Sequence, residues 1–344
     1  MDGHEDIASN ALEGRDFLKS AHEKRNLESF DARRGTATVG LPDLLAGNVK
    51  IIFATIWVAP CADNDLIGDS TPCYTTPEEA RKLAREQLEY YLRLVADPRI
   101  SLVRTRRDLN SILAANEARL GFVLLMEGAD PLVTPLEARE WFDAGVRIIA
   151  PAWHRTRYAG GTGAPGPLTS YGRELMAEMK SAGLILDVSH LAEESFFDAM
   201  RLFDGPVIAS HSNCRSLVPT DRQLTDEMIQ LLVRRGAVIG IVPYNKFLKP
   251  SWTKNQSPKS DVTLRDVIGH MKHVWRIAGD MLHTGIGSDF DGGFGVESIP
   301  AELDTIADLQ KIGVQLRMEH VPDVDVRNIL ANNWLRFLRE ALPE

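Results

Sequence analysis

The sequence predicts an α/β protein built as a distorted (β/α)8 barrel. Short apolar runs alternate with longer amphipathic segments, and eight such runs can be counted in the 344 residues. Several runs are continuously apolar, as expected for parallel strands buried on both faces. A single barrel commonly uses 250 residues or more, so we expect residues 1–344 to form one domain with C-terminal helices from about residue 300.

The expected strands follow one another along the whole chain. The first lies at the very start and ends in Gly-His-Glu-Asp at residues 3–6. The other seven are residues 49–60, 121–127, 146–154, 184–190, 206–211, 237–244 and 284–289. Between them, amphipathic patterns predict helices at residues 76–96, 170–182, 193–202 and 226–235. Residues 61–75, 158–167 and 249–261 are rich in Gly, Pro, Ser or Asp and should form loops over a pocket at the strands' carboxyl ends.

Charge and composition exclude several classes of partner. The 48 acidic residues outnumber the 39 basic ones, and the net charge of -9 argues against nucleic acid, which needs clustered Lys and Arg. No apolar run approaches the roughly 18 residues of a membrane helix, and the first residues do not resemble an export signal. We therefore expect a cytoplasmic protein with no membrane partner. Cys61, Cys73 and Cys214 show no CxxC spacing and are expected to be small buried or surface residues, not a disulfide framework.

Polar side chains end six of the eight apolar runs. Ionisable groups at the ends of buried strands are costly unless they are paired or bind a metal. A barrel would bring all six ends to one rim, which predicts a functional site there. The side chains are His4 and Asp6, Glu127, His154, His190, His211 and Asp289.

These residue types suit a centre with two cations. His4 and Asp6 are two residues apart, so on a strand both side chains would point the same way and bind one cation. Glu127 has two oxygens and could bridge to a second cation held by His190 and His211. Two ions could share a hydroxide and make it a nucleophile at neutral pH.

Two remaining strand-end residues could then assist hydrolysis. Asp289 could take the proton of the attacking water and deliver it to a leaving amine, and His154 could donate to the oxyanion. Each residue alone has a structural alternative, such as turn chemistry around Asp289. Recurrence on six strands favours a common site. By contrast, His270 and His273 lie three apart on an amphipathic helix, a spacing typical of a solvated face.

Several motifs resemble those of the renal (membrane) dipeptidase family of zinc metallopeptidases, within the amidohydrolase superfamily. They are Asp-Gly-His-Glu-Asp at residues 2–6, Glu-Gly-Ala-Asp at 127–130, Asp-Val-Ser-His at 187–190, Ser-His-Ser-Asn at 210–213 and Gly-Ser-Asp-Phe-Asp-Gly at 287–292. The resemblance implies a distorted TIM barrel with two zinc ions, the five metal ligands named above, and a bridging hydroxide beside Glu127. It also implies hydrolysis of dipeptides, often with a D-residue at the C-terminal position.

The resemblance assigns two residues to the substrate. His154 corresponds to a histidine near the scissile carbonyl, and Arg222 to an arginine that binds the free carboxylate. The planar guanidinium can grip a carboxylate with two hydrogen bonds. The alternative for Arg222 is a surface salt bridge to Asp221 or Asp226.

The primary hypothesis is therefore a binuclear zinc dipeptidase. An alternative keeps the metals and acts on N-acyl amino acids or lactones, and a third is a non-catalytic binding module. The resemblance also suggests a homodimer. Because cysteines are few and the last residues are polar, we expect no counterpart to the disulfides and lipid anchor of animal members.

Overall fold

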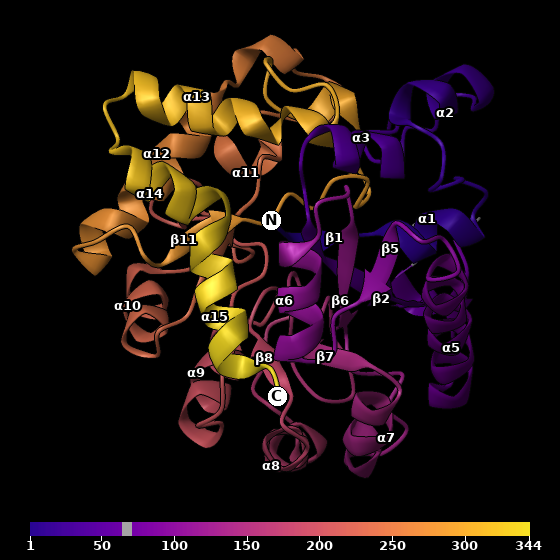
Figure 1. Cartoon of the computed structure of the whole chain (residues 1–344). Helices are drawn as coiled ribbons and strands as arrows, with labels where there is room; N and C mark the ends of the chain where they lie inside the picture. The colour runs from indigo at the N-terminus through magenta and orange to yellow at the C-terminus, as the bar shows by residue number, and fades with distance from the viewer. Residues whose placement is uncertain (64–70) are drawn as a thin grey trace.

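The computed structural model describes residues 1–63 and 71–344. Its centre is a parallel sheet of seven strands, six of them in the order β1, β2, β6, β7, β8 and β9, with β5 (Ile100–Leu102) paired to the start of β6. The parallel pair β10–β11 follows (Figure 1). The strands are β1 (Asp2–Glu5), β2 (Ile51–Trp57), β6 (Leu120–Glu127), β7 (Val146–Ala150), β8 (Ile185–Asp187), β9 (Val207–Ile208), β10 (Ile239–Ile241) and β11 (Thr284–Ile286).

Two single bridges turn these strands into a ring. Ala209, just past β9, pairs with Ile239, and Glu5 pairs with Phe290, just past β11. The N–H of Gly240 donates to the carbonyl of Ala209 at 2.8 Å, and the N–H of Asp289 donates to the carbonyl of His4 at 3.2 Å. The predicted barrel is confirmed, and its two weakest seams explain why it is distorted.

Helices surround the ring (Figure 1). The bounds of α8 and α9 are those predicted, and the predicted starts of α5 and α10 lie within one residue of the observed ones. A capping box between Thr76 and Glu79 fixes the start of α5. The helices are α1 (Ile7–Leu12), α2 (Ala21–Leu27), α3 (Leu41–Ala46), α5 (Pro77–Leu94), α6 (Arg106–Ala114), α7 (Ala138–Asp143), α8 (Ser170–Ala182), α9 (Glu193–Leu202), α10 (Asp226–Arg234), α11 (Asn245–Leu248), α12 (Leu264–Ala278), α13 (Gln310–Met318), α14 (Asp323–Arg327) and α15 (Asn333–Ala341).

The C-terminal helix closes the interior of the barrel at the amino-terminal ends of its strands. Trp334 of α15 is fully buried, packs edge-on against Phe53 of β2, and donates its indole N–H to the carbonyl of Ile286 at 3.0 Å. Glycines make room for it, because a Cβ on Gly285 would lie 2.3 Å from the indole nitrogen. Among the described residues, we find no helix that is both long and apolar enough to cross a bilayer.

Several strands are shorter than predicted. The apolar runs toward residues 154, 190, 211 and 289 leave the sheet two to four residues earlier, and their last residues form loops. His190 and Asp289 have φ values of 67° and 57°, a left-handed conformation that ends a strand. Asp6 likewise lies beyond β1, at the N-cap of α1. The predicted site residues therefore sit mostly on the rim and not within the strands.

The prediction that the cysteines are small buried or surface residues and not a disulfide framework is wrong for two of them. Cys61 and Cys73 form a disulfide, whereas Cys214 is buried and free, as expected. The short parallel strands β3 (Ala59–Pro60) and β4 (Cys73–Tyr74) bring the two cysteines together, and no sequence pattern signals this pairing. The predicted loop at 61–75 lies partly outside the described residues.

The solvated face predicted for His270 and His273 is also wrong. Both side chains lie on the buried face of α12. Nδ1 of His270 accepts the N–H of Cys214 at 3.1 Å, and Nε2 of His273 lies 2.7 Å from a carboxylate oxygen of Asp226. These contacts give both histidines a structural role between α12 and its neighbours.

Candidate active site

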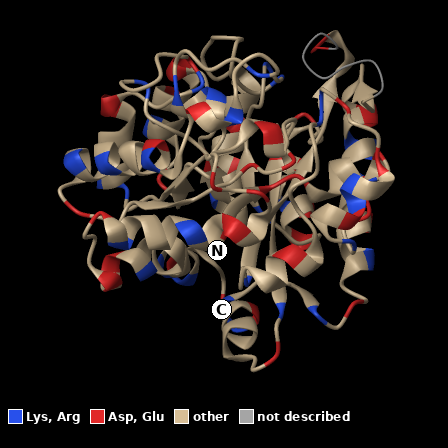
Figure 2. Ribbon diagram, turned by 90° about the horizontal axis from the view of Figure 1, so that it is seen from above, with Lys and Arg blue, Asp and Glu red and all other residues tan. Residues whose placement is uncertain are grey.

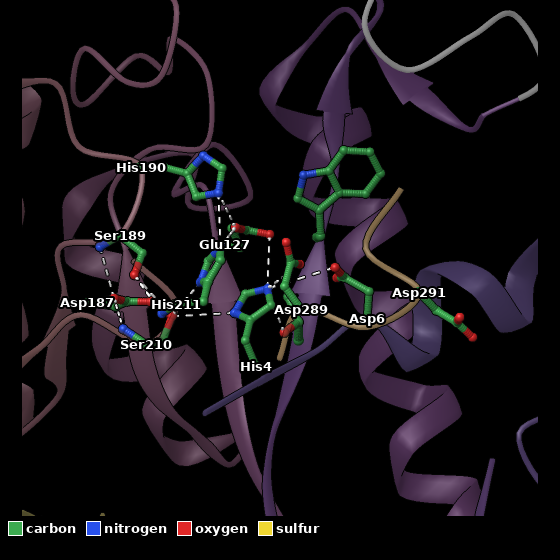
Figure 3. A network of polar contacts seen from close by, with 12 residues as sticks. His4, Asp6, Glu127, Asp187, Ser189, His190, Ser210, His211, Asp289 and Asp291 are labelled. Carbon is green, nitrogen blue, oxygen red and sulfur yellow. Dashed lines mark hydrogen bonds and ion pairs between the residues drawn. The ribbon is translucent and has the colours of Figure 1, made fainter. Parts of the chain in front are cut away.

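All five predicted metal ligands meet around Glu127 at the carboxyl ends of the strands (Figure 3). One oxygen of Glu127, Oε1, lies 3.2 Å from Nε2 of His190 and 3.4 Å from Nε2 of His211. The other oxygen, Oε2, lies 3.5 Å from Nε2 of His4, which in turn is 3.8 Å from Oδ2 of Asp6. Glu127 thus stands between two pairs of potential ligands.

The histidine rings are oriented by partners that the sequence did not identify. The Ser210 hydroxyl lies 2.7 Å from Nδ1 of His211 and donates to the carboxylate of Asp187. The same carboxylate accepts the N–H groups of Ser189 and Ser210. The Thr162 hydroxyl lies 3.0 Å from Nδ1 of His190. Such outer partners leave Nε2 of each ring free to face the centre.

Asp187 and Ser210 belong to motifs that signalled the family, but nothing in those motifs assigned them a role. They lie at the ends of β8 and just past β9, so the parallel register places them side by side. Thr162 comes from the glycine-rich loop at 158–167, whose Gly161 bridges to Ala164 and Leu191. A lid over the pocket was predicted there, and part of that segment does reach the site.

The atoms of the cluster fit cations. Oε1 of Glu127 and Oδ1 of Asp6 are buried and accept no hydrogen bond within the described ranges. The Nε2 atoms of His190 and His211 lie 3.0 Å apart. With each Nδ1 beside a hydroxyl, both lone pairs can be directed into the same space, where a cation would satisfy them together.

The electrostatics of the buried cluster lead to the same conclusion. Burial opposes a charge on His4, but Glu127 and Asp6 outweigh it and raise the pKa of His4 to about 10. Burial and neighbouring carboxylates raise the pKa of Asp6 to about 7. Burial, together with Arg222 and His4, holds the pKa of His190 well below its ordinary value. Acidic segments gather in the middle of the molecule when it is seen from above (Figure 2). A bound cation would stabilise both the charged carboxylates and the neutral imidazole of this cluster.

Asp289 lies at the edge of this cluster. Its Oδ1 is 4.0 Å from Nε2 of His4, and burial raises the pKa of its carboxyl well above the ordinary value. The side chain has room because Gly292 faces it: a Cβ there would lie 2.1 Å from Oδ1. The position is therefore close enough to exchange a proton with a water molecule inside the cluster.

Arg222 is buried beside His211, so the alternative of a surface salt bridge is wrong. Its Nη2 donates to the carbonyl of His211 at 2.6 Å and its Nη1 to the hydroxyl of Ser212 at 3.2 Å. Its Nε–H has no partner within the described ranges. Oδ2 of Asp221 instead accepts the N–H of Gly163, and Asp226 contacts His273. The guanidinium thus keeps donors for an anionic ligand.

His154 lies on the loop after β7, with a quarter or less of its side chain exposed. Its Nδ1 is 2.9 Å from Oδ2 of Asp63, a residue that no sequence pattern selected. The neighbouring Trp153 ring lies 6.3 Å from the ring of His190 and packs edge-on against Trp57. His154 is thus adjacent to the cluster without being part of it.

A closed parallel barrel with carboxylates and imidazoles converging on its rim is typical of metal-dependent hydrolases. The chain belongs to peptidase family M19, the membrane dipeptidase family, which it matches over residues 1–342. The membership makes it a metal-dependent dipeptidase by class.

Individual relatives agree with this assignment. The chain is 27% identical to dipeptidase verJ of Clonostachys rogersoniana, over 98% of this chain and 83% of that protein. It is 26% identical to mouse dipeptidase 3, over 99% of this chain and 64% of the mouse protein. It thus spans about two thirds of the mouse relative's length.

Solved structures with the same fold include two metallopeptidases. Dipeptidase AC is 25% identical, with a TM-score of 0.82, over 100% of this chain and 98% of that one. A metallopeptidase from Rhodobacter sphaeroides is also 25% identical, with a TM-score of 0.82, over 99% and 98% of the two chains. That relative was solved with a phosphinate mimic of the dipeptide L-Ala-D-Ala.

Proposed function

We propose that the protein is a binuclear zinc dipeptidase. His4 and Asp6 would hold one ion, His190 and His211 the other, and Glu127 would bridge them. Support comes from the two faces of Glu127, each with two potential ligands. Imidazole and carboxylate together are the ligand types that zinc prefers in catalytic sites.

A dipeptide would be held by residues beside the cluster. Arg222 would bind the free carboxylate with the donors that its contacts to His211 and Ser212 leave over. His154 would hydrogen-bond the carbonyl oxygen of the scissile bond and stabilise its developing negative charge. The length of the substrate would follow from the fixed separation of these two groups.

Asp289 would handle the proton. When bound, two zinc ions polarise a carbonyl and make water acidic enough to attack at neutral pH. Asp289 takes the proton that the attacking water releases and delivers it to the leaving nitrogen as the C–N bond breaks. The products are two free amino acids, and the carboxylate of Asp289 is regenerated.

We further propose that a D-residue is accepted at the C-terminal position. The support is the Rhodobacter sphaeroides relative, which was solved with an L-Ala-D-Ala mimic. A cytoplasmic location and a homodimeric assembly stay predictions from the sequence.

The observation that carries the proposal is the convergence of the ligand atoms on both oxygens of Glu127. The test is turnover of L-Ala-L-Ala, L-Ala-D-Ala and their N-acetyl forms by zinc-loaded protein, with bound zinc counted by mass spectrometry. We expect two ions per chain and hydrolysis that requires the free amino group. Faster cleavage of the N-acetyl forms would instead favour an N-acyl amino acid hydrolase, and no turnover at full zinc loading would reject hydrolysis of these substrates.

A further inference from the structure

A carboxylate outside the metal cluster contacts the imidazole that we propose to face the substrate. Oδ2 of Asp63 lies 2.9 Å from Nδ1 of His154. This oxygen is buried and makes no hydrogen bond in the described part of the chain, so its ion-pair contact with the imidazole is the interaction that it has. The imidazole is therefore the group toward which the Asp63 carboxylate is directed.

The disulfide holds Asp63 close to this position. Cys61 lies two residues before Asp63, and its bond to Cys73 joins the ends of β3 and β4. The crosslink therefore fixes the chain two residues before Asp63. Asp63 ends the short 3-10 helix Cys61–Asp63, so it is anchored directly from β3.

A polar bridge links the same pair of strands to the loop that carries His154. The hydroxyl of Tyr74, at the end of β4, donates to the carboxylate of Asp130. The other oxygen of Asp130 accepts the N–H of Arg157 at 2.9 Å, three residues after His154. Both loops are therefore fixed relative to each other by contacts that do not involve the Asp63 carboxylate itself.

The second ring nitrogen of His154 lies beside the glycine-rich loop. A Cβ on Gly163 would be 3.5 Å from Nε2, in ordinary van der Waals contact with it. The residue before it, Thr162, reaches Nδ1 of the metal-site residue His190. Nε2 thus points toward the segment that borders the metal cluster.

The pairing decides which proton the imidazole can present. An ionised carboxylate only accepts hydrogen bonds, so Nδ1 of His154 must carry a proton to satisfy Asp63. Nε2 can then donate to a carbonyl oxygen only if the ring is the doubly protonated imidazolium. An Nδ1–H directed at the carboxylate holds the ring in one orientation, as a carboxylate does for the histidine of a catalytic triad.

We propose that Asp63 is a positioning residue that acts through His154. It fixes the orientation of the ring, and with it the direction in which Nε2 meets the substrate's carbonyl oxygen. This inference rests on the proposed dipeptidase function. The negative charge of the Asp63 carboxylate is the essential property. Asp63→Asn removes the charge and keeps the shape of the side chain, so it is the decisive variant.

Kinetics of a double-mutant cycle test the proposal. In zinc-loaded protein we expect Asp63→Asn to lower kcat for L-Ala-D-Ala by roughly 10- to 100-fold with little change in KM or bound zinc, as when an outer partner of a histidine is lost. In a His154→Gln background the same change should have almost no further effect. Multiplicative losses, an unchanged kcat or loss of zinc would overturn the proposal.

Proton NMR provides a readout that does not depend on turnover. We expect a downfield imidazole N–H signal that disappears in His154→Gln and moves upfield in Asp63→Asn. Asp97→Asn is the matched control, because this carboxylate pairs with Arg99 before β5, at the opposite end of the barrel. If the parent cleaves no dipeptide but the signal behaves as expected, the proposed function fails while the pairing stands. A signal unaffected by Asp63→Asn would overturn the pairing.

Discussion

Replacing Asp289 by asparagine separates proton transfer from metal binding. The side chain makes no hydrogen bond within the described ranges, and its Oδ1 lies 4.0 Å from Nε2 of His4. Asparagine has the same shape and, among residues other than glycine, tolerates the left-handed φ of 57° well. Since burial already disfavours the charged carboxyl, the neutral amide should leave the fold and its stability nearly unchanged.

The expected loss of activity follows from the role assigned to the carboxyl group. General acid–base catalysis contributes about 10²- to 10⁴-fold to a rate, and a tenfold change is about 1.4 kcal/mol of activation free energy. Asp289→Asn should therefore raise the barrier by about 3–5 kcal/mol. The assay is kcat for a dipeptide under saturating substrate, with bound zinc measured on the same sample.

Asp280→Asn is a suitable control, because this exposed carboxylate lies before β11 and Asp289 lies after it. It removes the same charge at the other end of the same strand and should leave kcat unaltered. Parent-level turnover by Asp289→Asn would refute the role in proton transfer. A parallel loss of zinc would show that Asp289 is a ligand instead.

Three further substitutions test the site and its support. Glu127→Gln should reduce bound zinc from two ions toward one per chain, because an amide nitrogen cannot replace a carboxylate oxygen as ligand. Retention of two ions would contradict the role of Glu127 as a bridge between them. Arg222→Ala should raise KM for dipeptides by about 10- to 100-fold, the equivalent of a charged hydrogen bond, while dipeptide amides should show no such change. An equal effect on both substrate types would argue against carboxylate binding. Trp334→Ala should lower the free energy of unfolding by about 3–5 kcal/mol in urea titrations, and a loss below about 1 kcal/mol would mean that the barrel does not depend on this side chain.

The sequence predicted the barrel and the central ligands because both depend on local patterns. Buried parallel strands are continuous apolar runs, and His4 and Glu127 lie directly within two of them. Parallel strands then bring their carboxyl ends together whatever lies between them. The spacing argument for Asp6 was less sound, since this residue leaves the strand and reaches the site from the N-cap of α1.

Contacts between loops could not be predicted in this way. Asp63 and His154 are separated by 91 positions, and neither lies in a periodic segment that would place the other. The partner of Cys61 depends on the pairing of two-residue strands, which leave no signal in hydrophobicity. The buried face of α12 was missed because histidine is polar, although His270 and His273 both find polar partners inside the protein.

The pairing between β1 and the segment just past β11 can form only late in the synthesis of the chain. During synthesis β1 emerges long before two of its contacts. The segment around Phe290, which pairs with β1, and Trp334, which packs beside it, follow hundreds of residues later. A ribosome-bound chain therefore holds His4 and Asp6 on a strand with an open edge. The proposed metal centre would be complete only after the chain has closed on itself, and a nascent intermediate would expose that edge to other polypeptides.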